Sequence, residues 1–300
     1  MSPRIAVISG ALALALALAA PAGAQAVSPS QAAAPTRTPA DAISSHSAQA
    51  GLPAPLNVNF ANIKANKGNS IAAGTTASTS IPYTFTITHE VTVNVHAGDF
   101  LTGIELYTGA VEQPEFQLDN WVDPDCKDVS TTKYVCTGTI DLNPARDLEN
   151  AATGWPWHAS AWAWALNGQD PNSSKFNILR TAYAESPDAA APAIVRQATL
   201  SINATPEPVK KGKSLTVTGT LKRANWDTSK YSGYTKQRVQ LQFRDKRSSG
   251  YKTVKTITSD RSGHLKSTVK AVKGGYWRYV FAGSTTTAKA VSQADYVDVK

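Results

Sequence analysis

The sequence predicts an all-β protein built from two β-sandwich domains. Its clearest strand lies in residues 274–284, where Trp277, Tyr279 and Phe281 fall on one face and glycine or serine turns flank the segment. A period of two is typical of a half-buried strand. Similar short alternating segments recur along the chain, and the first half shows no convincing helical period. With 300 residues, 42% of them hydrophobic, the chain is long enough for two cores.

The N-terminus has the pattern of an exported protein. Arg4 precedes an apolar run over residues 5–20, and small residues with an A-x-A cleavage pattern follow, so residues 1–26 are predicted to be a signal peptide. A membrane anchor is the alternative, but Pro21 and Gly23 close the run and no stop-transfer pattern follows. We therefore expect a secreted, extracellular protein with no transmembrane anchor after signal cleavage.

Residues 27–55 are rich in Ala, Pro, Ser and Thr and are predicted to form a flexible, disordered linker. The first domain is expected at residues 56–192, ending in a second linker at 187–192. Its predicted strands cover residues 82–88, 89–96, 116–121, 137–142, 154–168 and 176–183. His89 and His96 are an odd number of positions apart and would project to opposite faces, which argues against a shared metal site.

The two cysteines, Cys126 and Cys136, are expected to form a disulfide, because oxidation is normal in an exported protein. The nine residues between them suffice for a hairpin, and closing this loop would contribute roughly 2–3 kcal/mol. A metal site is the alternative, but no other Cys and no His lies nearby to complete four ligands.

The charge divides the chain sharply. Residues 27–195 hold 8 basic and 16 acidic side chains, whereas residues 196–300 hold 21 basic and 6 acidic ones. This predicts an acidic first domain and a basic second domain. The basic charge either attracts an anionic polymer or only solvates strand faces and protects sheet edges from aggregation.

The second domain, residues 193–300, contains seven short predicted strands, which is the number expected of an immunoglobulin-like (Ig-like) sandwich. They cover residues 198–203, 214–221, 238–244, 252–258, 264–271, 276–282 and 296–300. Glycine-containing turns separate several of them.

A set of motifs in this domain resembles an Ig-like domain common in secreted proteins of actinobacteria. The motifs lie at residues 203–212, 215–219, 225–226, 231–234, 239–244, 275–279 and 295–299. Weaker likeness extends to Cys126, Cys136 and the pair Gly154-Trp155. The resemblance implies export and a β-sandwich, and some members are named as calcium-binding while others are uncharacterised. It supplies no catalytic motif.

No catalytic motif is evident in the sequence either. The chain has no G-x-S-x-G nucleophile elbow and no lone cysteine near a histidine, and its histidines show no ligand spacing. We therefore expect a non-enzymatic protein without a cofactor. A secreted hydrolase whose site is assembled only by folding is the remaining alternative.

Calcium is the metal that the sequence best accommodates, because an acidic loop offers several oxygen ligands. The spacing does not match an EF-hand, and Asp-Pro-Asp is also ordinary turn chemistry, so a plain turn is the alternative. The candidate ligands are Asp119, Asp123, Asp125 and Asp128.

Two candidate ligand surfaces combine aromatic with other side chains. In residues 154–168, Trp155 and Trp157 would share one strand face and Trp162 and Trp164 the other. One pair is expected in the core; the second is either a platform for sugar rings, for which we name Trp162 and Trp164, or is covered by the neighbouring domain.

The basic domain offers the other surface, where aromatic residues beside cations suit a phosphate- or carboxylate-bearing glycan. The predicted residues are Lys210, Lys211, Arg247, Trp226, Tyr231 and Tyr234. The sequence thus predicts binding at the cell envelope, to anionic wall polymer or glycan and not to nucleic acid. A calcium-binding or purely structural module is the main alternative.

Overall fold

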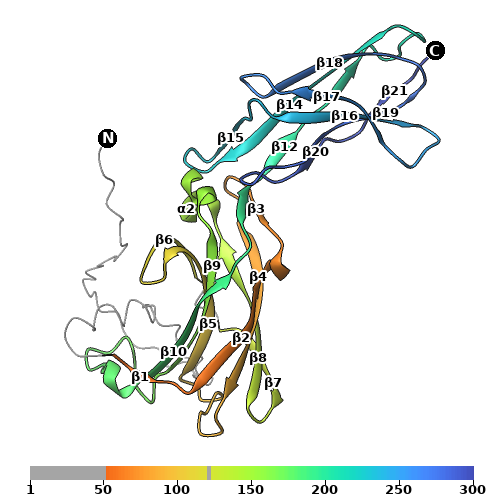
Figure 1. Ribbon diagram of the computed structural model, residues 1–300. Coiled ribbons are helices and arrows are strands. Elements are labelled where there is room, and N and C mark those ends of the chain that lie inside the picture. The colour runs from red at the N-terminus through yellow and green to blue at the C-terminus, as the bar shows by residue number, and fades with distance from the viewer. Residues whose placement is uncertain (1–51, 120–122) are drawn as a thin grey trace, which may run out of the picture. The chain divides into compact units, whose positions relative to one another are not determined.

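The computed structural model describes residues 52–119 and 123–300 (Figure 1). The predicted signal peptide and residues 27–51 of the predicted linker lie outside the described residues. The linker prediction was wrong for its last residues. Ala54 and Pro55 form strand β1, which pairs in parallel with strand β10 (Ala182–Ala190). Over the described ranges, no helix has the length and apolar character needed to span a membrane.

The chain divides into two compact units. One comprises the described residues up to Leu56 together with Asn94–Leu101 and Trp164–Tyr183. The other comprises Asn57–Val93, the described part of Thr102–Ala163, and Ala184–Lys300. The predicted domain boundary between residues 192 and 193 stays a prediction.

The strands between residues 54 and 190, apart from β3 (Ile71–Ala73), form two sheets. One has the order β2-β4-β8-β7, and the other has the order β1-β10-β9-β5-β6. The bounds are β2 (Val58–Ala65), β4 (Thr79–His89), β8 (Lys133–Leu142), β7 (Asp125–Ser130), β9 (Trp157–Ala165), β5 (Phe100–Ala110) and β6 (Gln113–Leu118). This division of successive strands between two sheets is that of an Ig-like sandwich.

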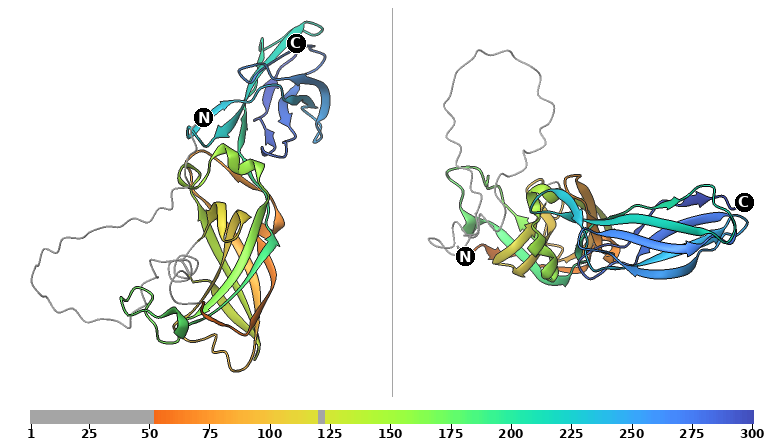
Figure 2. Two further views of the ribbon diagram at one scale, coloured as in Figure 1. Left: turned by 60° about the vertical axis from the view of Figure 1, so that its left-hand side comes forward. Right: turned by 90° about the horizontal axis from the view of Figure 1, so that it is seen from above.

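Strands between residues 198 and 297 repeat the pattern. In one sheet β14 (Ser214–Asn225) pairs with β12 (Ala198–Leu200), β13 (Asn203–Thr205), β15 (Lys230–Gly233) and β18 (His264–Lys270). In the other, the order is β17-β16-β19-β20, with β21 also on β19 (Figures 1 and 2). The bounds are β17 (Lys252–Thr258), β16 (Arg238–Asp245), β19 (Gly275–Phe281), β20 (Ala290–Val291) and β21 (Asp295–Val297). A short parallel pair, β3 (Ile71–Ala73) and β11 (Ile194–Arg196), lies apart from these sheets.

The all-β prediction is confirmed, and so are the faces of the strand at residues 274–284. Trp277, Tyr279 and Phe281 are 6%, 0% and 3% exposed. They pack with Leu215, Val217 and other buried side chains of the core. The Tyr279 hydroxyl donates to the Val217 carbonyl at 2.9 Å, so the buried phenol keeps a hydrogen-bond partner.

The predicted disulfide is present. Cys126 of β7 and Cys136 of β8 are direct register partners and are joined by a bond between their sulfurs. Cys136 is fully buried, whereas most of β7 is exposed. The bond therefore fastens an exposed edge strand to its sheet.

Two predicted strands were wrong in their extent. Strand β4 ends at His89, and residues 90–96 form turns in which Val91 is 78% exposed. In the closing segment, a short 3-10 helix, η3 (Ile178–Arg180), precedes β10, which then runs through Pro187 into the predicted second linker. Beyond Tyr183, where its pairing with β1 ends, β10 is an edge strand, and an edge position tolerates a proline that donates no hydrogen bond.

Short helices also occupy predicted loops. The helix α2 (Pro144–Asp147) begins at a predicted turn, where the Asn143 side chain accepts a hydrogen bond from the Ala145 backbone and proline stands at the first helical position. Two further 3-10 turns are η1 (Asn66–Gly68) and η2 (Asn150–Gly154).

Candidate functional site: an arginine–tyrosine sheet face

The outer face of sheet β17-β16-β19 carries arginines and tyrosines at paired positions. Arg244 of β16 pairs with Tyr276 of β19, and Tyr276 pairs with Tyr296 of β21. In the next row, Gln242 pairs with Thr253 on one side and with Arg278 on the other. Paired residues on antiparallel strands project to the same face. We call this surface the Arg–Tyr face and define it by Gln242, Arg244, Tyr251, Thr253, Tyr276, Arg278 and Tyr296.

The two guanidinium groups stack on tyrosine rings. The Arg244 guanidinium carbon lies 4.2 Å from the ring centre of Tyr276 and 5.3 Å from that of Tyr251. The Arg278 guanidinium carbon lies 3.7 Å from the ring centre of Tyr251. The rings of Tyr276 and Tyr296 are in contact, with centres 5.0 Å apart. Cation–π contacts of this kind attract the guanidinium to the face of the ring.

Each guanidinium also donates a hydrogen bond, one within the sheet and the other to the turn after β16. Arg278 donates through Nε to the Gln242 side-chain oxygen at 2.9 Å, and Arg244 donates to the Ser248 carbonyl at 2.8 Å. A guanidinium has five N–H donors in a fork that matches carboxylate and phosphate oxygens. The arginines are therefore oriented while further donors remain to receive an anion.

The paired residues of the Arg–Tyr face, all within the described part of the chain, include no carboxylate. The adjacent acid, Asp245, already has partners: Lys273 lies 2.8 Å away, and the Arg247 backbone donates to it at 3.0 Å. The Arg247 hydrogen bond, followed by that from Lys273, lowers the pKa of Asp245. Asp245 is thus neutralised locally, and the face keeps its positive charge.

The predicted lysines and Arg247 lie at one end of this sandwich. Lys210 and Lys211 are exposed in the turn before β14, and Arg247 is exposed in the turn between β16 and β17. Two contacts bring these turns to the same end. The Gly212 backbone N–H donates to the Ala271 carbonyl, and Lys273, two residues after Ala271, forms an ion pair with Asp245, two residues before Arg247. Arg247 adjoins the Arg–Tyr face, since Ser248 accepts the hydrogen bond from Arg244.

The predicted aromatics lie elsewhere. Trp226 follows the far end of β14, whose 12 residues span about 36 Å, whereas Lys211 precedes its near end. It is 2% exposed, and its indole nitrogen donates to the Gly74 carbonyl at 2.8 Å. Tyr231 donates to Gln197, and Tyr234 is 9% exposed beneath Arg223. The structure does not bring these three aromatics together with Lys210 and Lys211, although each residue's role in binding stays a prediction.

The four tryptophans of residues 154–168 also differ in position. Trp157 is buried in β9 together with Ala159 and Ala161, while Trp155 precedes the strand and is 44% exposed. Trp162 and Trp164 are 7% and 0% exposed, and Trp164 packs edge-on against Phe176. A sugar platform at Trp162 and Trp164 remains a prediction that would require these buried rings to become accessible.

The predicted calcium ligands are spread over several surroundings. Asp123 and Asp125 line one cavity, Asp128 pairs with Tyr134 in the β7–β8 ladder, and Asp119 lies near Glu105. In the part of the chain that is described, no group of three or more His, Cys, Asp or Glu side chains is arranged to hold a metal ion. Calcium binding stays a prediction, which a calcium-dependent melting temperature lost in Asp123→Asn/Asp125→Asn would support.

The Arg–Tyr face was partly visible in the sequence. The alternation of residues 276–281 places Tyr276 and Arg278 on the outward face. What the sequence lacks is the register that sets Arg244 opposite Tyr276 and brings Tyr251 between the two arginines.

Comparison with known proteins adds little to this geometry. No family model and no curated protein matches the chain. Solved structures with some similarity include fibronectin(III)-like modules of CbhA from Clostridium thermocellum (14% identity over 81% of this chain and 92% of that one, TM-score 0.26). A bacterial ice-binding adhesin of 1.5 MDa gives 11% identity over 83% and 67%, with a TM-score of 0.26.

A protein from Thermotoga maritima proposed to be a superoxide reductase is also similar, with 13% identity over 34% of this chain and 86% of that one and a TM-score of 0.26. Scores of this size support no inference about function. The Ig-like assignment therefore rests on the chain's own strand order, and the resemblance to actinobacterial Ig-like domains stays a prediction.

Proposed function

We propose that this chain is a secreted, non-enzymatic binding protein that attaches to an anionic polymer or glycan of the cell envelope. The observation that supports this proposal is the Arg–Tyr face, where two guanidinium groups are held on tyrosine rings and none of their paired neighbours is acidic. The predicted signal peptide and the disulfide agree with an extracellular location.

The chemistry of the face suits a phosphate- or carboxylate-bearing glycan. Arginine forms two parallel hydrogen bonds with such anions, and the neighbouring aromatic rings offer flat surfaces to sugar rings. Because stacking already orders both guanidinium groups, binding loses less side-chain entropy than it would with free lysines. The face therefore favours anionic chains over neutral ones.

Retention on purified cell wall tests the proposal. Residues 27–300 should bind at low salt and be released at high salt, because the contact is largely electrostatic. Arg244→Glu/Arg278→Glu should reduce retention at least tenfold, since each reversal replaces an attraction with a repulsion. The matched control is Lys266→Glu/Lys270→Glu, which makes the same change in net charge at exposed positions of β18 in the opposite sheet.

The control should lose no more than about threefold, because charges outside the contact act only through the screened field. Equal losses in both variants would show that net charge, and not the Arg–Tyr face, causes retention. If the wild-type chain is not retained at any salt concentration, the proposal fails and a purely structural module becomes the better reading.

A further inference from the structure

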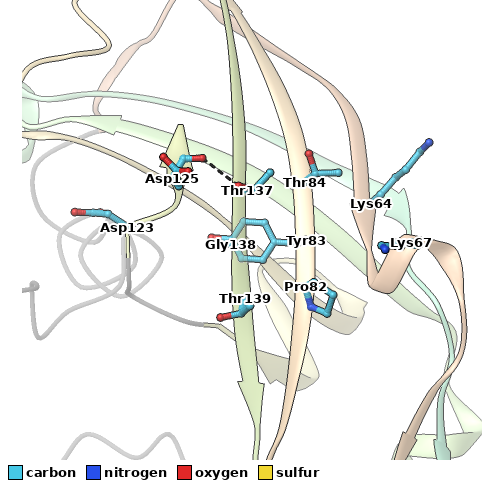
Figure 3. A pocket seen from close by; sticks show the side chains of 10 residues that line it. All are labelled: Lys64, Lys67, Pro82, Tyr83, Thr84, Asp123, Asp125, Thr137, Gly138 and Thr139. Carbon is cyan, nitrogen blue, oxygen red and sulfur yellow. Dashed lines mark hydrogen bonds between the residues drawn. The ribbon is translucent and has the colours of Figure 1, made fainter. Parts of the chain in front are cut away.

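A second surface, on sheet β2-β4-β8-β7, is hollowed into a cavity of about 680 Å³ (Figure 3). This volume is in the range of small-ligand sites. Four consecutive register partners cross the sheet there: Lys64 of β2, Thr84 of β4, Thr137 of β8 and Asp125 of β7. Since paired residues share a face, a cation, two hydroxyls and a carboxylate form one row.

The two ends of this row carry opposite charges. Lys64 and Lys67 line one side of the cavity, and Asp123 and Asp125 line the other (Figure 3). Among the described residues, neither lysine has an ion-pair partner, and Asp123 has no hydrogen-bond or ion-pair partner. Asp125 contacts Lys127 at 3.2 Å, but both side chains are largely exposed, so this pair is weak and can be displaced.

The distance across the sheet explains why these charges do not neutralise one another. Strands are spaced about 4.8 Å apart, so the first and fourth residues of the row are separated by about 14 Å. Partial burial raises the pKa of Asp123. A bound molecule with a negative group at one end and a positive group at the other would satisfy both sides.

The floor between the charged ends is formed by β4 and β8. Thr84 pairs with Thr137 and Pro82 pairs with Thr139, so these four residues share the face of the row. Tyr83 alternates with them and packs on the other, buried side of the sheet, where its ring covers Gly138. The Thr137 hydroxyl donates to the Asp125 carbonyl at 3.3 Å and can still accept a hydrogen bond, so the floor offers both apolar contact and hydrogen-bonding groups.

We propose that this cavity, the Lys–Asp cavity, binds a short peptide with free ends, its ammonium group at Asp123 and Asp125 and its carboxylate at Lys64 and Lys67. An extended peptide spans about 3.3–3.6 Å per residue, so three or four residues match the separation of the charged ends. The threonine hydroxyls face the peptide backbone. This site is separate from the Arg–Tyr face and does not depend on the function proposed for it.

Calorimetric titration with unblocked alanine peptides of two to six residues tests the proposal. Affinity should be greatest for three or four residues, and C-terminal amidation or N-terminal acetylation of tetra-alanine should each weaken it about tenfold. Lys64→Ala/Lys67→Ala should weaken binding similarly and should also abolish the effect of amidation. Asp123→Asn/Asp125→Asn should abolish the effect of acetylation instead.

The controls are Lys133→Ala and Glu112→Gln, which remove one exposed charge of each sign outside the cavity. Both should bind tetra-alanine as the wild type does, and unchanged melting temperatures would show that all variants fold. Equal affinity for the doubly blocked peptide, a preference for an uncharged disaccharide, or no binding at millimolar peptide would each overturn the proposal.

Discussion

Two sheets with equivalent strand order, β10-β9-β5-β6 and β20-β19-β16-β17, carry opposite charge. In the first, Gln117 donates to Glu105 at 2.7 Å, Ser160 donates to Glu185 at 2.6 Å, and Tyr107 donates to Asp188 at 3.0 Å. In the second, the corresponding face carries Arg244 and Arg278 stacked on tyrosines.

The difference lies in how the charges are used. Glu105 is 9% exposed, and burial raises its pKa to about 7; the Gln117 hydrogen bond opposes this rise, while Glu185 and Asp119 add to it. Its carboxyl is thus largely withdrawn from solvent. The arginines remain half-exposed with free donor capacity. The charged side chains of the first sheet therefore form hydrogen bonds within the protein, whereas those at equivalent positions of the second sheet remain exposed to solvent.

The largest effect is expected in the core that supports the arginines. Tyr279→Ala should cost about 3–5 kcal/mol of unfolding free energy, because it empties a fully buried aromatic site. Tyr279→Phe should cost only about 1 kcal/mol, the value of its hydrogen bond to Val217. Urea unfolding of both variants measures this, and equal losses would contradict the packing account.

The buried acid makes the first sheet sensitive to pH. The pKa of Glu105 is higher in the folded state than its usual 4.5, so the folded state binds more protons between pH 4.5 and 7, and stability should fall as pH rises through this window. Glu105→Gln should remove this loss and stabilise the protein by on the order of 2–3 kcal/mol at pH 8. Below pH 4 the variant and wild type should be nearly equal. A difference in unfolding free energy between Glu105→Gln and the wild type that stays constant from pH 4 to 8 would contradict this expectation.

The disulfide distinguishes the two sandwiches in another way. Cys126→Ser/Cys136→Ser should cost about 2–3 kcal/mol, because the cross-link constrains the unfolded chain. Thermal unfolding measures this loss. Retention on cell wall should be unchanged in the folded variant, since the Arg–Tyr face is built from other strands. A parallel loss of retention would instead link the acidic sandwich to binding.

Local pattern predicted much of the fold. Alternation identified the inward face of β19, and the cysteine spacing identified the hairpin of β7 and β8. Alternation also misled, because residues 90–96 carry valines at every second position and yet form turns. Alternation with a period of two shows which residues would share a face of a strand. It does not show whether a neighbouring strand is present to pair with that segment.

The candidate site depended on information of longer range. Arg244 and Tyr276 are far apart in sequence and meet only through the register of β16 and β19. Trp226 was predicted to contact a ligand, but folding buries its side chain, and its indole nitrogen donates a hydrogen bond to the Gly74 carbonyl. Charge composition predicted a basic region, whereas the choice among its cations required the sheet.

The most direct test replaces both stacked arginines with lysines, which carry the same charge. In Arg244→Lys/Arg278→Lys the net charge is unchanged, but the planar groups that stack on Tyr251 and Tyr276 are lost. We would measure the Kd for a soluble wall polymer at 150 mM salt, with Lys266→Arg/Lys270→Arg as control. We expect about tenfold weaker binding for the first variant and little change for the control. Unchanged binding by Arg244→Lys/Arg278→Lys would contradict a stacked arginine site and leave only general attraction by positive charge.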